Sequence, residues 1–482
     1  MPARMGRESM RKLRVGVLTM SDGRKYIHED LLETNWTYQR RVAAALERTG
    51  LVEVVQGEAV VNTSEVAQQE GRRLARAEVD LTILNYAIWC YPHLSAMATH
   101  FAPGPYLLFC NVHPSECGMV GMLAAAGTMD QLGKPYTRVW GDIDDPSVLA
   151  RVMSYIRAAG ALSELRGQTY GLFGGRPLGM YTAVANLDQW ASMFGLDVEH
   201  VEQQDVVTYA HQVDDARAEA GLKWLEERVG HIAYDNEGLT REKLKLQVKS
   251  YHAYRQIIEE RGLQFVGTKA HGDLTDTFVT VDIAEAFLND PYDWEGPHEP
   301  IVAATEADMD GALTMQLFKL FTRGEPVLFS DVRHYDHEDN VWYFANSGTH
   351  ATYFAGRSRT PEDNLKNVSF LPEASYYPAG GASVHHFAAA GEVTLARLAR
   401  KQGRYWMAIV PGEIVSFPKE KAIAKGNTIT PEWPCAFTRL QCSADDFLGG
   451  FPCNHIHGCY GKWVDELLHV AAILGIEAKV FA

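Results

Sequence analysis

Long hydrophobic runs are missing from this 482-residue sequence. No segment approaches the ~20 apolar residues that a membrane-spanning helix needs, which excludes a membrane partner. The basic first residues, 1–14, are followed only by the short apolar stretch VGVLTM. That stretch is too short for the apolar core of a secretory signal peptide and is typical of a first β-strand. We therefore expect a cytoplasmic protein.

Positive charge and cysteine are also scarce. The chain has 45 Lys and Arg against 61 Asp and Glu, which gives a net charge of −16. Such a surface repels phosphate backbones, so nucleic acid is excluded as an expected partner. The seven cysteines are scattered, and none forms a C-x-x-C pair. An odd number in a long chain argues against a disulfide framework, and we expect reduced thiols.

The pattern of apolar segments predicts an α/β protein. From residue 14 to 160, short apolar runs alternate with helical stretches, as in a doubly wound parallel sheet. The segment RGQTYGLFGGRPLGMYT restarts this pattern at residue 166, and after about residue 320 the chain becomes rich in aromatic and β-branched residues. We predict two doubly wound parallel-sheet domains, 1–165 and 166–320, followed by a smaller β-rich, barrel-like C-terminal domain, 321–482.

Two acidic residues follow short apolar segments of the second half. PIVAAT leads to Glu306, and PVLFS leads to Asp331. Ligands of doubly wound sheets bind beyond the carboxyl ends of the strands, so neighbouring strands would bring both carboxylates to one site. The alternative is structural: Glu306 and Asp308 could lie in a first helical turn, and Asp331 could cap a turn. The pattern alone leaves both interpretations open.

Two histidines lie close together near the C-terminus. The segment FPCNHIHGCYG, residues 451–461, has the composition of a tight polar loop and carries His455 and His457. In an extended segment these two side chains would point to the same side. Together with two carboxylates, a histidine would suit a divalent ion such as Mn²⁺, Mg²⁺ or Co²⁺. No spacing rule joins these distant residues, and a structural histidine is the alternative.

The chain resembles the L-fucose isomerase family of the fucose/arabinose isomerase group. The similar segments run in order along most of the chain, and the most specific is the one around the two acids. They are VGVLTMSDGRKYIHEDL, AIWCYPH, SYIRAAGALSELRGQTYGLFGGRPLGMYTAVANLDQW, DPYDWEGPHEPIVAATEADMDGALTMQLFKLFTRGEPVLFSDVRHY, the dipeptide WP at residues 433–434, and NHIHGCYGKWVDELLHVAAILGI.

The resemblance implies a set of site residues. A divalent ion, usually Mn²⁺, would be held by Glu306, Asp331 and His455, and the two carboxylates would be the catalytic acid and base. It also implies a homo-oligomer, a trimer or hexamer, with active sites between subunits. Residues that would bind substrate are Arg24 and Trp89, from a neighbouring subunit, and Tyr376, Trp433 and Asn454; Tyr377 matches nearly as well as Tyr376.

The sequence departs from the family's pattern at one place. Where relatives have the run GFQGQ, this chain has VGTKAHGD, so Lys269 or His271 stands where a neutral Gln is expected to touch substrate. A cation at this position could bind a sulfonated or phosphorylated sugar. Alternatively, Lys269 faces solvent or pairs with an acid such as Asp273. The chain is also shorter than the bacterial fucose isomerases.

The resemblance and the residues together predict a metal-dependent aldose–ketose isomerase. The substrate would be a small sugar such as L-fucose or D-arabinose, and the reaction would pass through an enediol. Two alternatives remain. The first is an isomerase or epimerase of an anionic sugar. The second is a non-enzymatic sugar-binding protein, because such proteins share doubly wound domains.

Overall fold

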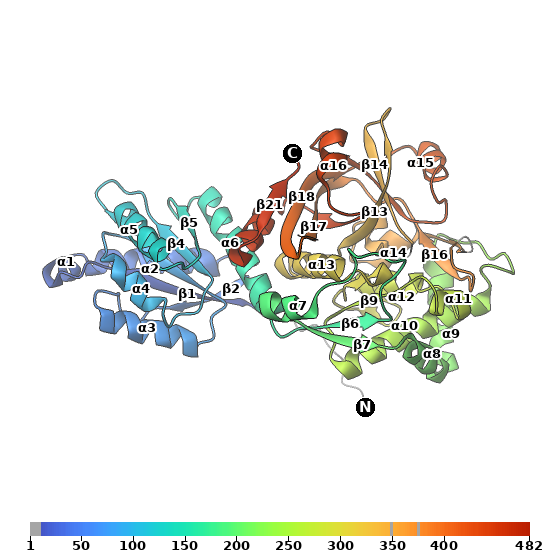
Figure 1. The fold of residues 1–482 in the computed structure, drawn as a ribbon, viewed down its shortest axis with the longest axis horizontal. Coiled ribbons are helices and arrows are strands. Elements are labelled where there is room, and N and C mark those ends of the chain that lie inside the picture. The colour runs from blue at the N-terminus through green and yellow to red at the C-terminus, as the bar shows by residue number, and fades with distance from the viewer. Residues whose placement is uncertain (1–10, 348–349, 374–375) are drawn as a thin grey trace. The chain divides into compact units, whose positions relative to one another are not determined.

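The computed structural model describes residues 11–347, 350–373 and 376–482, and it divides into two compact units (Figure 1). The N-terminal unit contains residues 11–163 and Asp465–Gly475. The larger unit contains Glu164–Val464 and Ile476–Ala482. The division into three domains, with boundaries after residues 165 and 320, remains a prediction beside this two-unit division. Among the described residues, no helix is long and apolar enough to span a membrane.

The N-terminal unit is built on a five-stranded parallel sheet in the order β2-β1-β3-β4-β5. Its inner strands β1, β3 and β4 are buried on both faces because helices cover both, which leaves one hydrophobic cluster on each side. The order reverses between β1 and β3, which makes their carboxyl ends the expected ligand position. The elements are β1 (Leu13–Met20), α1 (Lys25–Asp30), α2 (Leu32–Glu47), β2 (Val52–Gln56), α3 (Ser64–Arg76), β3 (Leu81–Tyr86), α4 (Pro92–Ala98), β4 (Tyr106–Cys110), α5 (Gly118–Gln131), β5 (Tyr136–Trp140), α6 (Pro146–Leu165) and α17 (Val464–Leu474).

The larger unit begins with a four-stranded parallel sheet in the order β12-β9-β6-β7. Helix α10 and its neighbours bury their apolar faces in one large cluster beside this sheet. The elements are β6 (Thr169–Phe173), α7 (Leu187–Phe194), β7 (Asp197–Val201), α8 (Gln203–Gln212), α9 (Asp215–Arg228), α10 (Arg241–Arg261), β9 (Phe265–Thr268), α11 (Leu274–Thr277), α12 (Asp282–Asn289), the hairpin β10 (Tyr292–Asp293) with β11 (Gly296–Pro297), β12 (Ala303–Ala304), η1 (Thr305–Ala307) and α13 (Met309–Thr322).

Seven of the remaining strands form a barrel-like sheet in the same unit. Its order is β17-β20-β13-β14-β19-β18-β21, and pairing of β17 with β18 closes the sheet. A small sheet, β16-β15-β8, lies apart from it. The elements are β8 (His231–Ile232), β13 (Leu328–Asp336), β14 (Val341–Ala345), η2 (Thr352–Ala355), α14 (Pro361–Leu365), β15 (Ser369–Pro372), β16 (Ala382–His385), β17 (Gly391–Lys401), β18 (Arg404–Ile414), α15 (Lys419–Gly426), β19 (Cys435–Leu440), α16 (Ala444–Gly450), β20 (His455–Tyr460) and β21 (Glu477–Val480).

Helix α13 joins the parallel sheet to the barrel. It contacts β9 and β12 on one side and β13, β17 and β20 on the other. All of its residues except the last are buried, which fits a helix enclosed between two layers. Its N-terminus therefore lies where the two sheets meet. The predicted fold class, two parallel sheets and a β-rich C-terminal barrel, is confirmed.

Candidate active site

Glu306, Asp331 and His455 converge at the N-terminus of α13. One ligand atom from each lies within 4.8 Å of the others. The Nε2 atom of His455 is 3.3 Å from Oε2 of Glu306 and 3.5 Å from Oδ1 of Asp331. Residues that are far apart in the sequence thus form a single cluster of two carboxylates and one imidazole.

Glu306 reaches the cluster from the carboxyl end of a parallel strand, as expected. It follows β12 in the short turn η1, and both Glu306 (φ 55°) and Ala307 (φ 48°) have left-handed backbone conformations. Non-glycine residues rarely adopt this region, and such strain is common at functional sites. The turn stops the strand abruptly and directs the Glu306 side chain to the meeting point of the two sheets.

The prediction that Asp331 also ends a strand is wrong. It lies inside β13, which continues to Asp336, and β13 belongs to the barrel instead of the sheet that contains β12. The two acids therefore do not come from neighbouring strands. The apolar run before Asp331 ends because the outer half of β13 is exposed, so the change in composition marks a change in burial, and the strand itself continues.

His455 also lies in a barrel strand, so the prediction of a polar loop around it is wrong. It is the first residue of β20, and its Cα is paired with that of Asp331 in the antiparallel register. His455 and His457 point to the same side, as an extended segment requires, and both rings contact Phe329. Only His455 faces the acids, because Nε2 of His457 accepts a hydrogen bond from the guanidinium of Arg397 (3.0 Å).

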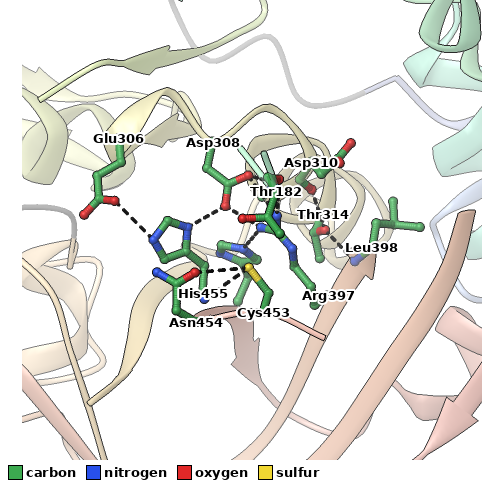
Figure 2. A network of polar contacts seen from close by, with 12 residues as sticks. Thr182, Glu306, Asp308, Asp310, Thr314, Arg397, Leu398, Cys453, Asn454 and His455 are labelled. Atoms are coloured by element: carbon green, nitrogen blue, oxygen red, sulfur yellow. Dashed lines mark hydrogen bonds and ion pairs between the residues drawn. The ribbon is translucent and has the colours of Figure 1, made fainter. Parts of the chain in front are cut away.

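A buried ion pair supports His455 from behind (Figure 2). Asp308 binds Nδ1 of His455 through Oδ2 (2.6 Å), and Arg397 donates to both carboxylate oxygens of Asp308. Asp308 also caps α13 by accepting from the Gly311 amide at 2.9 Å. The capping interpretation thus applies to Asp308, whereas the carboxylates of Glu306 and Asp331 remain available to bind a ligand. By holding the proton of His455 on Nδ1, Asp308 leaves Nε2 free to bind a ligand.

The electrostatics of the cluster fit a bound cation. Burial opposes ionisation of Glu306, but the imidazoles of His271 and His455 outweigh it and lower its pKa to about 2. Burial raises the pKa of Asp331 above its usual range. Burial also disfavours the charged form of His455, yet the carboxylates of Asp308 and Glu306 raise its pKa well above the usual value. Without an ion, a proton on His455 therefore compensates the acids, and a metal would displace it.

The cluster offers the kinds of ligand atom that a divalent metal binds, and one of them is not used in a hydrogen bond. Nε2 of His455 is buried and lacks a hydrogen-bond partner among the described residues. Two carboxylate oxygens and one imidazole nitrogen are suitable ligands for Mn²⁺ or Co²⁺. The amides of Asn346 and Asn454 donate to the two oxygens of Asp331 at 2.8 and 3.1 Å and hold it in place. Asn454, a predicted substrate-binding residue, thus lies at this cluster.

The segment that departs from the family pattern places His271, and not Lys269, toward the cluster. The Lys269 ammonium forms an ion pair with Asp273 (3.0 Å), which was one of the two alternatives for this residue. Nε2 of His271 lies 3.7 Å from Oε1 of Glu306. The assignment of Lys269 to substrate binding therefore stays a prediction without a supporting contact.

The predicted aromatic residues lie in a group of their own. The ring centroids of Tyr376 and Trp433 are 5.2 Å apart; Tyr376 is about half exposed (48%), and the indole of Trp433 is buried and donates to Glu373 (2.7 Å). Tyr377, the alternative to Tyr376, is buried and packs on His271, with ring centroids 5.1 Å apart. Of the two tyrosines, Tyr377 is the one with a described contact to His271, which lies near Glu306 of the cluster.

Arg24 and Trp89 belong to the N-terminal unit. Arg24 follows β1 and Trp89 follows β3, so both lie beyond the carboxyl ends of the two strands where the strand order reverses. The Arg24 side chain is about half exposed (48%) and forms an ion pair with Asp22 (2.5 Å). Their position is thus that of ligand-binding residues in a doubly wound sheet.

Sequence reasoning missed two residues that support the cluster: Arg397, which pairs with Asp308, and Asn346, which donates to Asp331. Arg397 is only 1% exposed although it lies in the apolar strand β17. An arginine inside a buried strand indicates a buried counter-ion, so the segment TLARLAR carried a usable signal. Asn346 follows β14 and has no comparable signal, because an asparagine after a strand is ordinarily a turn residue.

Comparison with known proteins extends the resemblance to nearly the whole chain. Three family models match in order: the first N-terminal domain of L-fucose isomerase (residues 12–167), the second N-terminal domain (258–323) and the C-terminal domain (344–481). L-fucose isomerase from Streptococcus pneumoniae is 24% identical over 97% of this chain and 93% of its own length. That from Haemophilus influenzae is 23% identical over 96% and 92%. A Klebsiella pneumoniae L-fucose isomerase is 25% identical over 68% and 62%. This chain belongs to the L-fucose isomerase family.

Proposed function

We propose that this protein is a metal-dependent aldose–ketose isomerase that acts on L-fucose, D-arabinose or a sugar of the same configuration near the carbonyl. Family membership supports the aldose–ketose isomerase activity. The convergence of Glu306, Asp331 and His455 within 4.8 Å is the observation that carries the metal-dependent part. Mn²⁺ is our first choice of ion, with Co²⁺ and Mg²⁺ as the alternatives.

The residues of the cluster have distinct roles in this proposal. A divalent ion held by Glu306, Asp331 and His455 would polarise the sugar carbonyl as a Lewis acid. One carboxylate removes the proton from C2 of the open-chain aldose, and this proton returns at C1; the proton of the C2 hydroxyl passes to O1, so that the carbonyl moves to C2. Asn346 and Asn454 orient Asp331 through the hydrogen bonds described above.

The two alternatives have less support. An isomerase or epimerase of an anionic sugar was suggested by Lys269, but this ammonium is paired with Asp273. A sugar-binding protein without catalysis has no need for a metal site made of two carboxylates and a histidine. We therefore retain the neutral-sugar isomerase as the proposed function.

Quaternary structure is part of the same proposal. Arg24 and Trp89 lie at the expected ligand position of the N-terminal unit, and the metal cluster lies in the larger unit. We propose a homo-oligomer, a trimer or hexamer, in which these residues of one subunit complete the site of another.

A panel of aldoses, neutral and phosphorylated, tests the function directly. Each sugar is incubated with the Mn²⁺-loaded protein, and ketose formation is followed by chromatography. We expect conversion of L-fucose or D-arabinose, loss of activity after chelation, and recovery with Mn²⁺ or Co²⁺. Full activity in rigorously metal-free protein, or turnover of phosphorylated sugars alone, would contradict the proposal.

A further inference from the structure

The outermost strand of the N-terminal sheet, β5, presents a row of aromatic and basic side chains. β5 is the last strand in the order β2-β1-β3-β4-β5, so its second side is a sheet edge among the described strands. Successive side chains of a strand point to opposite faces. Tyr136, Arg138 and Trp140 therefore share one face, whereas Val139 on the other face packs into a hydrophobic cluster. Arg138 and Trp140 are exposed, so the core does not require these residue types.

A groove of about 480 Å³ lies against this row and is open to solvent. Its volume is within the range of small-molecule sites, about 300–1,000 Å³. We call it the β5 groove, and its lining comes from the C-terminal end of α5, the turn that follows α5, and β5 itself. The lining residues are Asp130, Lys134, Pro135, Tyr136, Arg138 and Trp140. A small ligand can enter this groove without a rearrangement of the chain.

The two cations of the β5 groove, Lys134 and Arg138, form no ion pair within the described parts of the chain. The ammonium of Lys134 donates to the hydroxyl of Thr99 at 3.0 Å, and burial lowers its pKa. The guanidinium carbon of Arg138 lies 6.0 Å from the ring centroid of Tyr136. The chain has a net charge of −16, so its cations have many acids to pair with. Two cations that share a groove without a carboxylate partner favour an anion such as a phosphate.

The indole of Trp140 is held in place and still offers surface to a ligand. Arg151 on α6 donates to the carbonyl oxygen of Trp140 at 2.7 Å. The same guanidinium lies over the indole, 5.2 Å from the ring centroid. Trp140 nevertheless remains 49% exposed. A fixed and exposed indole is a surface on which a planar aromatic ring can stack.

The single acid of the β5 groove, Asp130, lies beside the hydroxyl of Tyr136. Burial and the Asp130 carboxylate together raise the pKa of this hydroxyl. Asp130 is thus directed toward Tyr136 and does not neutralise Lys134 or Arg138. A carboxylate also accepts hydrogen bonds from the hydroxyl groups of a ligand. The groove therefore combines an aromatic surface, two cations and one acceptor.

We propose that the β5 groove binds a nucleoside phosphate, whose base stacks on Trp140 and whose phosphate groups pair with Arg138 and Lys134. A ribose hydroxyl then donates to Asp130. A neutral sugar would leave the two cations without a counter-charge, and a free phosphate would leave the indole without a partner. The inference goes beyond the proposed function, because none of the predicted site residues lines this groove.

The test compares a probe that has both a base and phosphates with a probe that has phosphates alone. ADP and inorganic pyrophosphate are titrated into the full-length protein, and binding is measured by calorimetry. EDTA is present, so that neither probe binds through a metal ion. The variants are Trp140→Ala and Arg138→Gln. The control is Arg76→Gln, because Arg76 is an exposed cation at the end of α3 in the same unit.

We expect wild type to bind ADP with a Kd below about 1 mM and to bind pyrophosphate more weakly. Trp140→Ala should weaken ADP binding by about 5- to 100-fold, the usual effect of one lost stacking contact, and leave pyrophosphate binding unchanged. Arg138→Gln should weaken the binding of both probes by about 10-fold. Arg76→Gln should bind both as wild type does. If Trp140→Ala does not fold, Trp140→Leu replaces it.

Three results would overturn the inference. The first is a wild-type protein that binds no ADP at millimolar concentration, in which case the cations serve only to keep other strands away from the sheet edge. The second is ADP binding that is equally strong in folded Trp140→Ala and Arg138→Gln proteins, which would place the nucleotide elsewhere. The third is pyrophosphate binding as tight as that of ADP, which would show that the base is not recognised.

Discussion

Asp331 and His455 stand directly opposite each other on the antiparallel strands β13 and β20. Side chains of such cross-strand pairs lie on the same face with Cβ atoms about 4.5–5.5 Å apart. The barrel register alone therefore brings two of the three expected metal ligands together, and only Glu306 must be supplied by the parallel sheet. A shift of the register by one residue would turn one of the pair to the opposite face.

Loss of either member of this pair should weaken metal binding. We expect Asp331→Asn and His455→Gln to bind Mn²⁺ at least ~10-fold more weakly, because each removes a ligand that the other two cannot replace. The measurement is titration with Mn²⁺ followed by the rise in melting temperature, since a metal that binds only the folded state stabilises it. His337→Gln, at an exposed histidine just beyond β13, is the control and should behave as wild type. Equal Mn²⁺ affinity in all four proteins would disprove the site.

Asp308→Asn tests how far the carboxylate behind His455 contributes to metal binding, although Asp308 is not itself one of the three expected ligands. The amide loses the charge that holds His455 and leaves Arg397 buried without its counter-ion. We expect Mn²⁺ affinity to fall about 10- to 100-fold. The free energy of unfolding should fall by about 3–5 kcal/mol, as is typical when one partner of a buried ion pair is removed.

The matched control for Asp308→Asn is Glu392→Gln, whose ion pair with Lys462 is exposed. Exposed pairs contribute little, so this change should alter neither metal binding nor stability beyond about 0.5 kcal/mol. Metal affinity is read by calorimetry and stability by urea denaturation. Wild-type Mn²⁺ affinity in Asp308→Asn would show that His455 needs no support from this carboxylate.

The sequence predicted the layers of the fold better than the local geometry of the site. Alternating apolar runs are sufficient to predict parallel sheets, because a strand buried on both faces must be apolar throughout. The sequence pattern predicts a strand end at Asp331, because a buried strand that becomes exposed looks like a strand that stops. His455 was placed in a loop because its flanking Asn and Gly are turn residues in most contexts.

Other features of the site depend on tertiary contacts that no local pattern contains. A strained turn and an ion pair within five residues direct His271, and not Lys269, toward the cluster. The sequence shows neither of these features. Similarly, Arg397 is far from Asp308 in the sequence, so their pairing follows only from the packing of α13 against β17.

A buried acid behind the site should make stability depend on pH. Asp282 is fully buried, both of its carboxylate oxygens lack a hydrogen-bond partner among the described residues, and burial raises its pKa to about 7. Glu285, Glu373 and Tyr377 are the titratable neighbours whose charge it affects. With a folded pKa above the unfolded value of 3.8, the folded state retains a proton that the unfolded state loses, so stability should fall as the pH rises from about 4 to 7.

Asp282→Asn removes this titration while keeping the shape of the side chain. We therefore expect the variant to be more stable than wild type at pH 8, by up to a few kcal/mol, and to gain less at pH 5. Urea denaturation at both pH values measures the difference. Asp188→Asn, at an exposed acid in the first turn of α7, is the control. An equal effect of Asp282→Asn at both pH values would show that Asp282 is ionised in the folded protein.

Mixed oligomers test whether two subunits form each site. Trp89→Ala and Asp331→Asn are each expected to be inactive, because one lacks a proposed substrate contact and the other a proposed metal ligand. If a site combines Trp89 of one subunit with Asp331 of another, unfolding and refolding the two variants together should restore about a quarter of the sites in a random mixture. Activity of the mixture is compared with that of each variant treated alone. No recovery, or an active monomer by light scattering, would contradict the shared site.

The fate of the C2 hydrogen distinguishes proton transfer from a hydride shift. An enediol route passes this hydrogen through a carboxylate that can exchange with water, so a reaction in D₂O should place deuterium at C1 of the ketose.

Glu306→Gln and Asp331→Asn then identify the base, because each keeps the shape and removes the basic oxygen. The variant that loses the base should lose about 10²- to 10⁴-fold in kcat, provided that bound Mn²⁺, measured in parallel, is retained. Nuclear magnetic resonance of the product reports the position and the extent of labelling. Ketose without any deuterium at C1, together with normal turnover by both metal-loaded variants, would exclude the carboxylates as proton carriers and favour direct hydride transfer.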